Sequence, residues 1–316
     1  TYQLSATVDN SPLATRGNAG GFGLQWATTT INSLTFTGPT LLYSKNSPDS
    51  EAPGYSANLG VAQTLFNLEE NFDFYLTQAT NPAPRPITYA DTQGRCAGNK
   101  PCYNTFQTAV DDVNSGGTVV VYPRSFNADV VINKNVTVNF VGVAGETTTL
   151  NHFTLVNGTV NAPAGALTLL GNFTRDGGTF NHNNGTVAFG GATAQSLGGS
   201  ATTTFYNLTV DNNNGVTLNQ SATSVNRLTL TQGTFSNGNL LTLGNDATIE
   251  RAAGSLTSPP SFAGTVNVIY NGSAAVTTGP ELPVAASVLN ALTIANPGGV
   301  NLNAAAQVNG TLTLNT

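Results

Sequence analysis

One block of sequence occurs twice in the C-terminal part of this chain and constrains its fold more than any other feature. The first copy spans residues 205–230 and the second spans residues 290–314. Leu208 matches Leu292, and the two are 84 residues apart. Each copy consists of triplets in which an apolar, a polar and an apolar residue follow one another, separated by Asn and Gly. Such alternation predicts strands and such separators predict turns, so the repeat indicates a fold of stacked strands.

A shorter period lies within the long one. Triplets whose first and third residues are apolar begin at Leu167, Val187, Leu208 and Leu228. These starts are 20, 21 and 20 residues apart, and Leu292 and Leu312 are again 20 apart. Between the two copies the spacing is less regular, and the corresponding apolar residues are Ile249 and Val268. A period near 20, built of strands without helical segments, predicts a β-solenoid in which each coil stacks its inward apolar residues on the coil below. The long repeat then corresponds to about four coils.

A single helical segment precedes these coils. Phe106, Ala109, Val110 and Val113 fall on one helical face, and a pair of glycines at 116–117 ends the helix. The following run, residues 118–122, is apolar and has the composition of a buried strand. The sequence therefore predicts a short amphipathic helix at the start of the solenoid.

Two stretches of the chain resemble known families. Residues 91–145, with this helix and the alternating segment 129–140, resemble the opening of right-handed parallel β-helix proteins of the pectate-lyase-like superfamily, in which a short helix covers the first coil. From about Gly185 on, the recurring Gly-Thr-Val and Asn-Leu-Thr triplets are similar to the strand repeats of very large bacterial surface proteins. The resemblance implies an all-β chain with a right-handed parallel β-helix and a capping helix, in a structural or adhesive role.

The chain is predicted to have three parts. Residues 1–80 are rich in aromatic residues and contain several alternating segments, which indicate a β-rich arm or small domain. Residues 81–90 contain three alternating prolines, which favour a stiff linker. Residues 91–316 form the β-helix, with room for about nine or ten coils and a length of roughly 45 Å.

The charge of the chain excludes several partners. Only 8% of the residues are charged, the net charge is -6, and no basic cluster exists, so nucleic acid is not expected to bind. No apolar run approaches the roughly 18 residues that a membrane span needs. The low charge, the lack of any methionine and the lack of a signal peptide predict a processed, extracellular chain at a cell surface.

The two cysteines and the two histidines suggest no metal site. Cys96 and Cys102 close a short loop, and an isolated pair in a secreted chain predicts a disulfide. His152 and His182 are distant from each other in sequence, so four zinc ligands are not available. Each histidine lies among asparagines, which favours a turn or ladder position over a catalytic base. No metal and no cofactor are predicted.

Acidic residues give no catalytic constellation. Asp111 and Asp112 are neighbours on the expected helix, so they point in different directions and cannot flank one glycosidic bond. The remaining acids of the coils are scattered at Asp176, Asp211, Asp246 and Glu250. We therefore predict no catalytic residue and no enzyme. A polysaccharide lyase or hydrolase on the same fold is the alternative.

Asparagine and threonine provide two further sets of candidate residues. Eight Asn-x-Ser/Thr sequons offer possible glycosylation sites at Asn135, Asn157, Asn172, Asn184, Asn207, Asn219, Asn271 and Asn309. Outward threonines and asparagines of the triplets are expected to form rows along the β-helix. Such rows allow a second alternative, a monomeric module that binds carbohydrate or ice.

These features lead to one functional hypothesis. The sequence predicts a secreted structural protein, the subunit of a cell-surface filament or adhesin, which assembles head to tail with copies of itself. An uncovered last coil is an open edge, so either the chain is a fragment of a longer surface protein or another subunit covers this end. In the second case a strand from the N-terminal region of a neighbour can extend it. Surface polysaccharide and neighbouring cells are further partners that this role allows. The residues predicted for the subunit interface are Tyr2, Leu4, Val8, Leu292, Ile294, Leu312 and Leu314.

Overall fold

The computed structural model describes residues 85–315, apart from the side chain of Val225, and the backbone of eight strands within residues 1–84. The chain divides into two compact units, Thr1–Pro84 and Arg85–Thr316. Of the predicted interface residues, Tyr2 and Val8 lie outside the described residues, and Leu4 lies in a strand of which only the backbone is described.

The first unit contains antiparallel β-sheets. Its strands are β1 (Gln3–Thr7), β2 (Leu13–Asn18), β3 (Gly21–Trp26), β4 (Ile31–Thr37), β5 (Thr40–Asn46), β6 (Ser56–Leu59), β7 (Gln63–Leu68) and β8 (Phe72–Gln78). One sheet has the order β1-β4-β7 and the other has the order β2-β3-β8-β5-β6. These strands agree with the predicted β-rich N-terminal region. Within the described part of this unit, strand β1 pairs with β4 alone and lies at the edge of its sheet.

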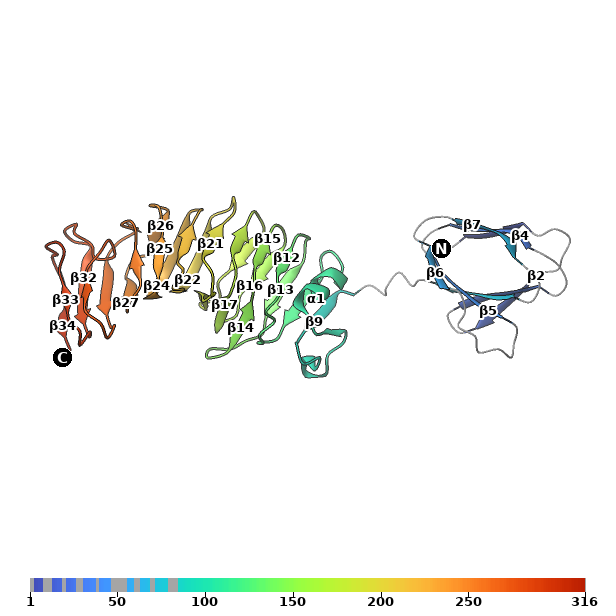
Figure 1. The fold of residues 1–316 in the computed structure, drawn as a ribbon, viewed down its shortest axis with the longest axis horizontal. Coiled ribbons are helices and arrows are strands. Elements are labelled where there is room, and N and C mark those ends of the chain that lie inside the picture. The colour runs from blue at the N-terminus through green and yellow to red at the C-terminus, as the bar shows by residue number, and fades with distance from the viewer. Residues whose placement is uncertain are drawn as a thin grey trace. The chain divides into compact units, whose positions relative to one another are not determined.

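The second unit is a parallel β-helix of about ten coils, which Figure 1 shows stacked one after another. The sheet pairings place its strands on three sides. The first side begins with a six-stranded sheet of order β10-β9-β11-β13-β16-β19. Its strands are β9 (Ile87–Ala90), β10 (Cys102–Tyr103), β11 (Thr118–Val121), β13 (Thr137–Phe140), β16 (Thr159–Asn161) and β19 (Thr179–Asn181). Every pairing in this sheet is parallel.

The second side is a seven-stranded parallel sheet. In spatial order it contains β12 (Val130–Ile132), β15 (Phe153–Leu155), β18 (Phe173–Arg175), β21 (Gln195–Gly198), β23 (Val216–Leu218), β25 (Thr234–Ser236) and β28 (Ser255–Leu256). A separate two-stranded sheet follows, made of β31 (Val276–Thr277) and β33 (Val300–Asn301).

The third side belongs to an eleven-stranded parallel sheet. Its main path runs through β14 (Thr147–Leu150), β17 (Ala166–Leu169), β20 (Thr186–Phe189), β22 (Thr203–Asp211), β24 (Ala222–Gln232), β27 (Ala247–Arg251), β30 (Val266–Tyr270), β32 (Leu289–Ile294) and β34 (Leu312–Leu314). The long strands β22 and β24 cover two sides. Their first residues pair with each other and continue the first side through β26 (Leu241–Leu243) and β29 (Ser261–Phe262).

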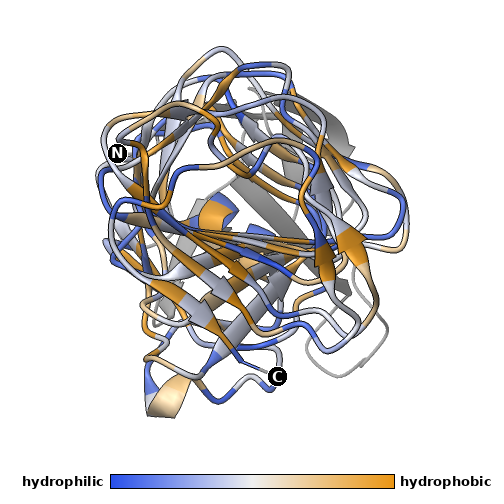
Figure 2. Cartoon of the chain, turned by 90° about the vertical axis from the view of Figure 1, so that its left-hand side faces the viewer, coloured by the Kyte–Doolittle hydropathy of each residue, from blue (hydrophilic) through white to orange (hydrophobic). Residues whose placement is uncertain are grey.

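The predicted ladder of triplets is confirmed. In register on the third side stand Leu167, Val187, Leu208, Leu228, Ile249, Val268, Leu292 and Leu312. All of them except Leu312 are buried. The alternation of buried and partly exposed residues along each strand places the apolar side chains inside, and Figure 2 shows hydrophobic and hydrophilic segments following one another along the strands.

Aromatic side chains fill the interior between the first and second sides. The rings of Phe153 and Phe173 are 5.6 Å apart, and those of Phe173 and Phe205 are 5.7 Å apart. All three side chains are fully buried. Burial of a side chain of this size contributes about 1.5–3 kcal/mol, and stacking from coil to coil makes each coil depend on its neighbours.

The predicted helix covers one end of the stack (Figure 1). Helix α1 (Phe106–Asp112) begins after Thr105, whose hydroxyl accepts a hydrogen bond from the Thr108 N–H at 3.2 Å. Its apolar face, Phe106, Ala109, Val110 and the following Val113, is buried. Within the described residues α1 is the only α-helix, and no helix there is long and apolar enough to cross a membrane.

The β-helix begins earlier than the sequence predicts. Strand β9 lies inside the segment 81–90 that was expected to be a linker, and it pairs in parallel with β11. The proline run stops at Pro86, so Ile87 and the three residues after it have free N–H groups for a ladder. Gly117 tightens this junction, because a Cβ there would come within 2.6 Å of the Val113 side chain and 2.7 Å of the Pro86 carbonyl oxygen.

Candidate functional site

The predicted disulfide is confirmed and belongs to the capped end. Cys96 and Cys102 are joined, and the bond connects the short helix η1 (Cys96–Gly98) to strand β10. Strand β10 covers the outer edge of β9, where the Tyr89 N–H donates to the Pro101 carbonyl at 3.0 Å and the Asp91 N–H donates to the Tyr103 carbonyl at 2.9 Å. The loop therefore occupies the hydrogen-bonding edge at which a further coil would stack.

A buried carboxylate orders this loop. Asp91 accepts hydrogen bonds from the Gln93 N–H at 3.0 Å and the Cys96 N–H at 3.2 Å, and it pairs with Arg124 at 3.1 Å. Burial opposes its ionisation, but the two backbone hydrogen bonds and the guanidinium outweigh that effect and lower the pKa of Asp91. The arrangement has a structural role, because all its partners are backbone groups or Arg124.

The neighbouring acids on α1 have separate partners. Asp112 bonds to Arg85, at 2.5 Å, and to the Tyr103 hydroxyl. Asp111 instead accepts a hydrogen bond from the Gln107 amide at 2.7 Å. The hydrogen bond to Asp112, opposed by desolvation, raises the pKa of Arg85. Burial and the hydrogen bond to Asp112 raise the pKa of Tyr103. The contacts of Asp112 with Arg85 and Tyr103 link the start of the β-helix to α1.

The scattered acids of the coils are engaged locally. Asp176 follows β18 on the second side and accepts from the Ser200 N–H at 3.1 Å. Asp246 precedes β27 on the third side and accepts from the Thr265 hydroxyl at 2.5 Å. Glu250 pairs with Arg227 and accepts from the Asn271 amide. Asp211 lies at the end of β22. Among the described residues no group of three His, Cys, Asp or Glu side chains is placed to hold a metal ion.

Both histidines occupy corners of the β-helix. His152 belongs to a ladder in which the Asp129 carboxylate accepts from the His152 N–H at 3.2 Å, and the His152 Nδ1 atom accepts from the Asn172 N–H at 2.9 Å. His182 accepts from the Asn184 N–H at 3.1 Å, and its ring stacks on Tyr206 at 5.5 Å. The contacts of His152 connect successive coils, as a ladder position requires.

The sequons lie on the surface. Six of their asparagines are exposed, namely Asn135, Asn157, Asn184, Asn219, Asn271 and Asn309. Asn172 and Asn207 are partly buried. Asn172 accepts from the Ser196 N–H at 2.9 Å, and Asn207 accepts from the Asn226 amide at 2.8 Å. These two side chains are therefore committed to contacts between coils.

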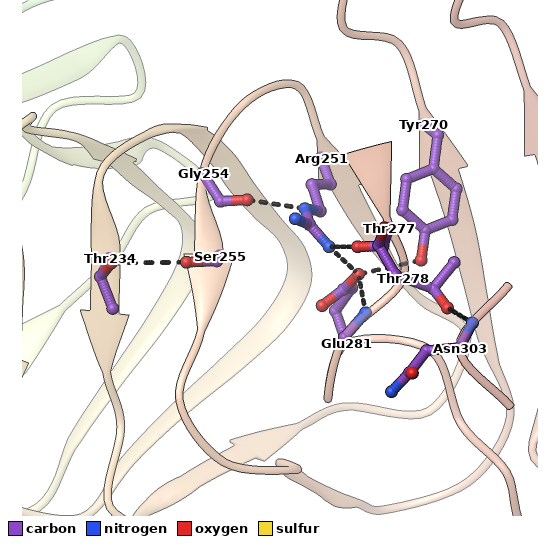
Figure 3. Close-up of polar contacts among 10 residues, drawn as sticks. Thr234, Arg251, Gly254, Ser255, Tyr270, Thr277, Thr278, Glu281 and Asn303 are labelled. Carbon is purple, nitrogen blue, oxygen red and sulfur yellow. Dashed lines mark hydrogen bonds and ion pairs between the residues drawn. The ribbon is translucent and has the colours of Figure 1, made fainter. Parts of the chain in front are cut away.

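A buried polar cluster near the last coils was not anticipated from the sequence (Figure 3). Glu281 is completely buried and pairs with Arg251 through one carboxylate oxygen. The same oxygen accepts from the Tyr270 hydroxyl and from the Gly279 N–H, each at 2.9 Å. Arg251 also donates to the carbonyls of Gly254, at 2.7 Å, and Thr277, at 3.0 Å. The cluster fastens the irregular segment around Glu281 to β27 and β30.

The electrostatics of this cluster follow from burial. Burial first, and then the negative charge of Glu281 and the hydrogen bond to it, raise the pKa of Tyr270. The second carboxylate oxygen of Glu281 is buried without a hydrogen-bond partner. No periodic pattern surrounds Glu281 in the sequence, so only the rarity of acids in this region could have drawn attention to it.

A pocket of about 400 Å³ lies beside the same segment. It is lined by Pro259, Phe262, Thr278, Gly279, Pro280, Leu282, Pro283, Val284, Ala285, Asn303 and Ala304. None of these side chains titrates, and most are apolar. The lining therefore offers mainly shape and apolar contact, and its polar side chains are those of Thr278 and Asn303.

Three leucines near the end of the β-helix are exposed, as are single valines elsewhere along it. Leu302, Leu312 and Leu314 are 57%, 55% and 66% exposed. Among the described residues, strand β34 pairs with β32 and with no other strand. Of the other predicted interface residues, Leu292 is buried at 5% exposure and Ile294 is partly buried, so both lie beneath β34 and not at the edge itself.

Comparison with known proteins gives no relative: no protein-family model, no curated protein and no solved structure matches this chain. The fold alone therefore defines the class, which is that of parallel β-helix proteins. The surface of this β-helix consists of the capped first coil, the last coil with its exposed leucines, and the sides between them.

Proposed function

We propose that this chain is a structural protein of a cell surface, a β-helical subunit that assembles head to tail into a filament or adhesive fibre. The last coil carries this proposal. Leu312 and Leu314 are more than half exposed on β34, and the outer edge of that strand has no paired strand among the described residues. Unpaired strand edges with apolar side chains are sites of association between chains.

Backbone pairing gives such a contact its geometry. A strand added beside β34 continues the third side, and its side chains cover those of Leu312 and Leu314. Strand β1, which contains Leu4, is an edge strand of its own sheet and is the donor that we propose, together with the flanking Tyr2 and Val8. A contact between two different surfaces does not close on itself, so it generates a filament and not a dimer.

Other properties support a place outside the cell. Disulfides such as Cys96–Cys102 persist in oxidising compartments. Only 8% of the residues are charged, and asparagine side chains supply several of the hydrogen bonds between coils. We also propose that residues 91–145 are related to the pectate-lyase-like superfamily. The part from about Gly185 on is proposed to be related to the strand repeats of bacterial surface proteins. Surface polysaccharide and neighbouring cells are the further partners that we propose for the fibre.

Sedimentation velocity at rising protein concentration tests the assembly. The wild-type chain is expected to sediment faster as its concentration increases. The variant Leu312→Glu/Leu314→Glu, which places charges on the apolar edge, is expected to remain monomeric. Val143→Glu is the matched control, because Val143 is 62% exposed and lies near the first coils.

Two outcomes would contradict the proposal. One is a wild-type chain that is monomeric at every concentration. The other is a Leu312→Glu/Leu314→Glu variant that assembles like the Val143→Glu control. Deletion of residues 1–80 adds a separate test of the donor strand, since filaments that persist unchanged after the deletion would exclude β1.

A further inference from the structure

The first side of the β-helix carries two rows of hydroxyl side chains. In the first row Thr118, Thr137, Thr159 and Thr179 are in register on four successive strands. In the second row Thr204, Thr223, Thr242 and Ser261 are in register on the next four. Phe180 of β19 and Phe205 of β22 contact each other in the interior at 5.9 Å, so both rows lie on the same side.

These eight hydroxyl groups are free to bind a ligand. All eight residues are partly or fully exposed, and no described residue forms a hydrogen bond with any of their hydroxyls. Each hydroxyl can donate one hydrogen bond and accept two. Because neighbouring strands are about 4.8 Å apart, each row presents this pattern along about 14 Å of a rigid surface.

A ladder of amides runs beside the first row. The Asn161 amide donates to the Asn139 carbonyl oxygen and the Asn181 amide donates to the Asn161 carbonyl oxygen, both at 2.7 Å. Each of these donors keeps a second N–H for another partner. The ladder holds the amides in one orientation, so binding would require little further loss of side-chain entropy. His182 follows Asn181 in the chain, and its ring stacks on that of Tyr206.

The two rows and the amide ladder contain no charged residue. A polyanion, an acidic peptide or a phosphate-bearing ligand would find no counter-charge on this surface. The chemistry that matches it is an uncharged ligand whose hydroxyl groups recur along a line. We propose that this side of the β-helix binds a neutral, linear polysaccharide chain, with the hydroxyl rows and the amides of Asn139, Asn161 and Asn181 as its hydrogen-bonding partners.

An ice surface fits the same rows less well. Strands β19 and β22 are not paired with each other, so the lattice of hydroxyls is interrupted between Thr179 and Thr204. The column beside the first row holds asparagines where an ice-like lattice would repeat the threonines. Hydrogen bonding to a flexible polymer tolerates such an interruption, whereas a crystal plane does not.

Affinity electrophoresis of the full chain tests the proposal. Native gels contain a neutral linear polymer, glucomannan or hydroxyethyl cellulose, or the polyanion polygalacturonate. The variant Thr137→Val/Thr159→Val/Thr179→Val removes three hydroxyls and keeps the β-branched shape. Thr168→Val/Thr209→Val/Thr229→Val is the matched control, because these threonines are partly exposed and point outward from the third side.

The wild-type chain is expected to be retarded by a neutral polymer, with at least a tenfold loss of affinity in the first variant and no change in the control. The proposal is overturned if no neutral polymer retards the chain, if only polygalacturonate does, or if both variants weaken binding equally. It is also overturned if the rows inhibit ice growth without binding polymer. Both variants keep Leu312 and Leu314, so their sedimentation reports separately on filament assembly.

Discussion

The two ends of the β-helix differ in how far the apolar side chains and the strand edge of the outermost coil are covered. At the first coil, α1 buries Phe106 and Val110, and the disulfide loop places β10 on the edge of β9. At the last coil, Leu312 and Leu314 are exposed, and the outer edge of β34 is unpaired among the described residues. A helix and a loop cover one end, whereas the outer strand edge of the other end is unpaired among the described residues.

The difference shows which contacts can stabilise a terminal coil that has only one neighbouring coil. A coil is stable because both of its neighbours cover its apolar residues. The closed end replaces the missing neighbour with a helix, a disulfide and the Arg85–Asp112 pair. The open end has no such replacement within the described residues, and the ion pair nearest to it there is the internal Arg251–Glu281 pair.

Truncation of one apolar side chain at each end should give the largest contrast. Phe106→Ala removes a ring that is 1% exposed and is expected to cost about 3–5 kcal/mol. Leu312→Ala removes a side chain that is 55% exposed and is expected to cost less than about 0.5 kcal/mol in the monomer. Urea unfolding below the concentration of assembly measures both changes, and equal losses would contradict the contrast between the ends.

Removal of the buried carboxylate should have the next largest effect. Glu281→Ala leaves Arg251 buried without its counter-charge, which is expected to destabilise the last coils by about 3 kcal/mol. Glu250→Ala is the matched control, since its pair with Arg227 is more exposed and is expected to contribute at most about 1 kcal/mol. Hydrogen exchange of β27, β30 and β32 measures the effect. Unchanged protection in the Glu281→Ala variant would show that the cluster does not stabilise the last coils.

Loss of the disulfide should have the smallest effect and should stay local. Cys96→Ser/Cys102→Ser opens a short loop, which is expected to cost about 2 kcal/mol. The Tyr89 and Asp91 amides, which bond to Pro101 and Tyr103, are expected to exchange faster, while the amides of β34 keep their rate. Slow exchange at Tyr89 in the variant would show that the disulfide is not needed to keep β10 in place.

The regular part of this fold was accessible from the sequence. Leu208, Leu228 and Ile249 stand in register because alternation along a strand and a period near 20 leave only one way to bury every apolar residue. The helix over 106–112 was predictable for the same reason, since its buried residues share one face. The disulfide followed from there being only two cysteines.

The irregular parts were not accessible in this way. Ile87 to Ala90 is too short to be recognised as a strand without β11 beside it. Glu281 is buried because Arg251 and Tyr270, which are far away in sequence, meet it in the interior. The hydroxyl rows depend on the register of eight strands, and β22 and β24 change sides within a single strand. Such features arise from tertiary contacts that no local pattern contains.

Negative-stain electron microscopy of the purified full chain at increasing concentration tests the central proposal most directly. Stacking at the open end predicts unbranched filaments that lengthen with concentration and that are absent from the Leu312→Glu/Leu314→Glu variant. Single particles of constant size at every concentration, or filaments that form equally in that variant, would contradict the account.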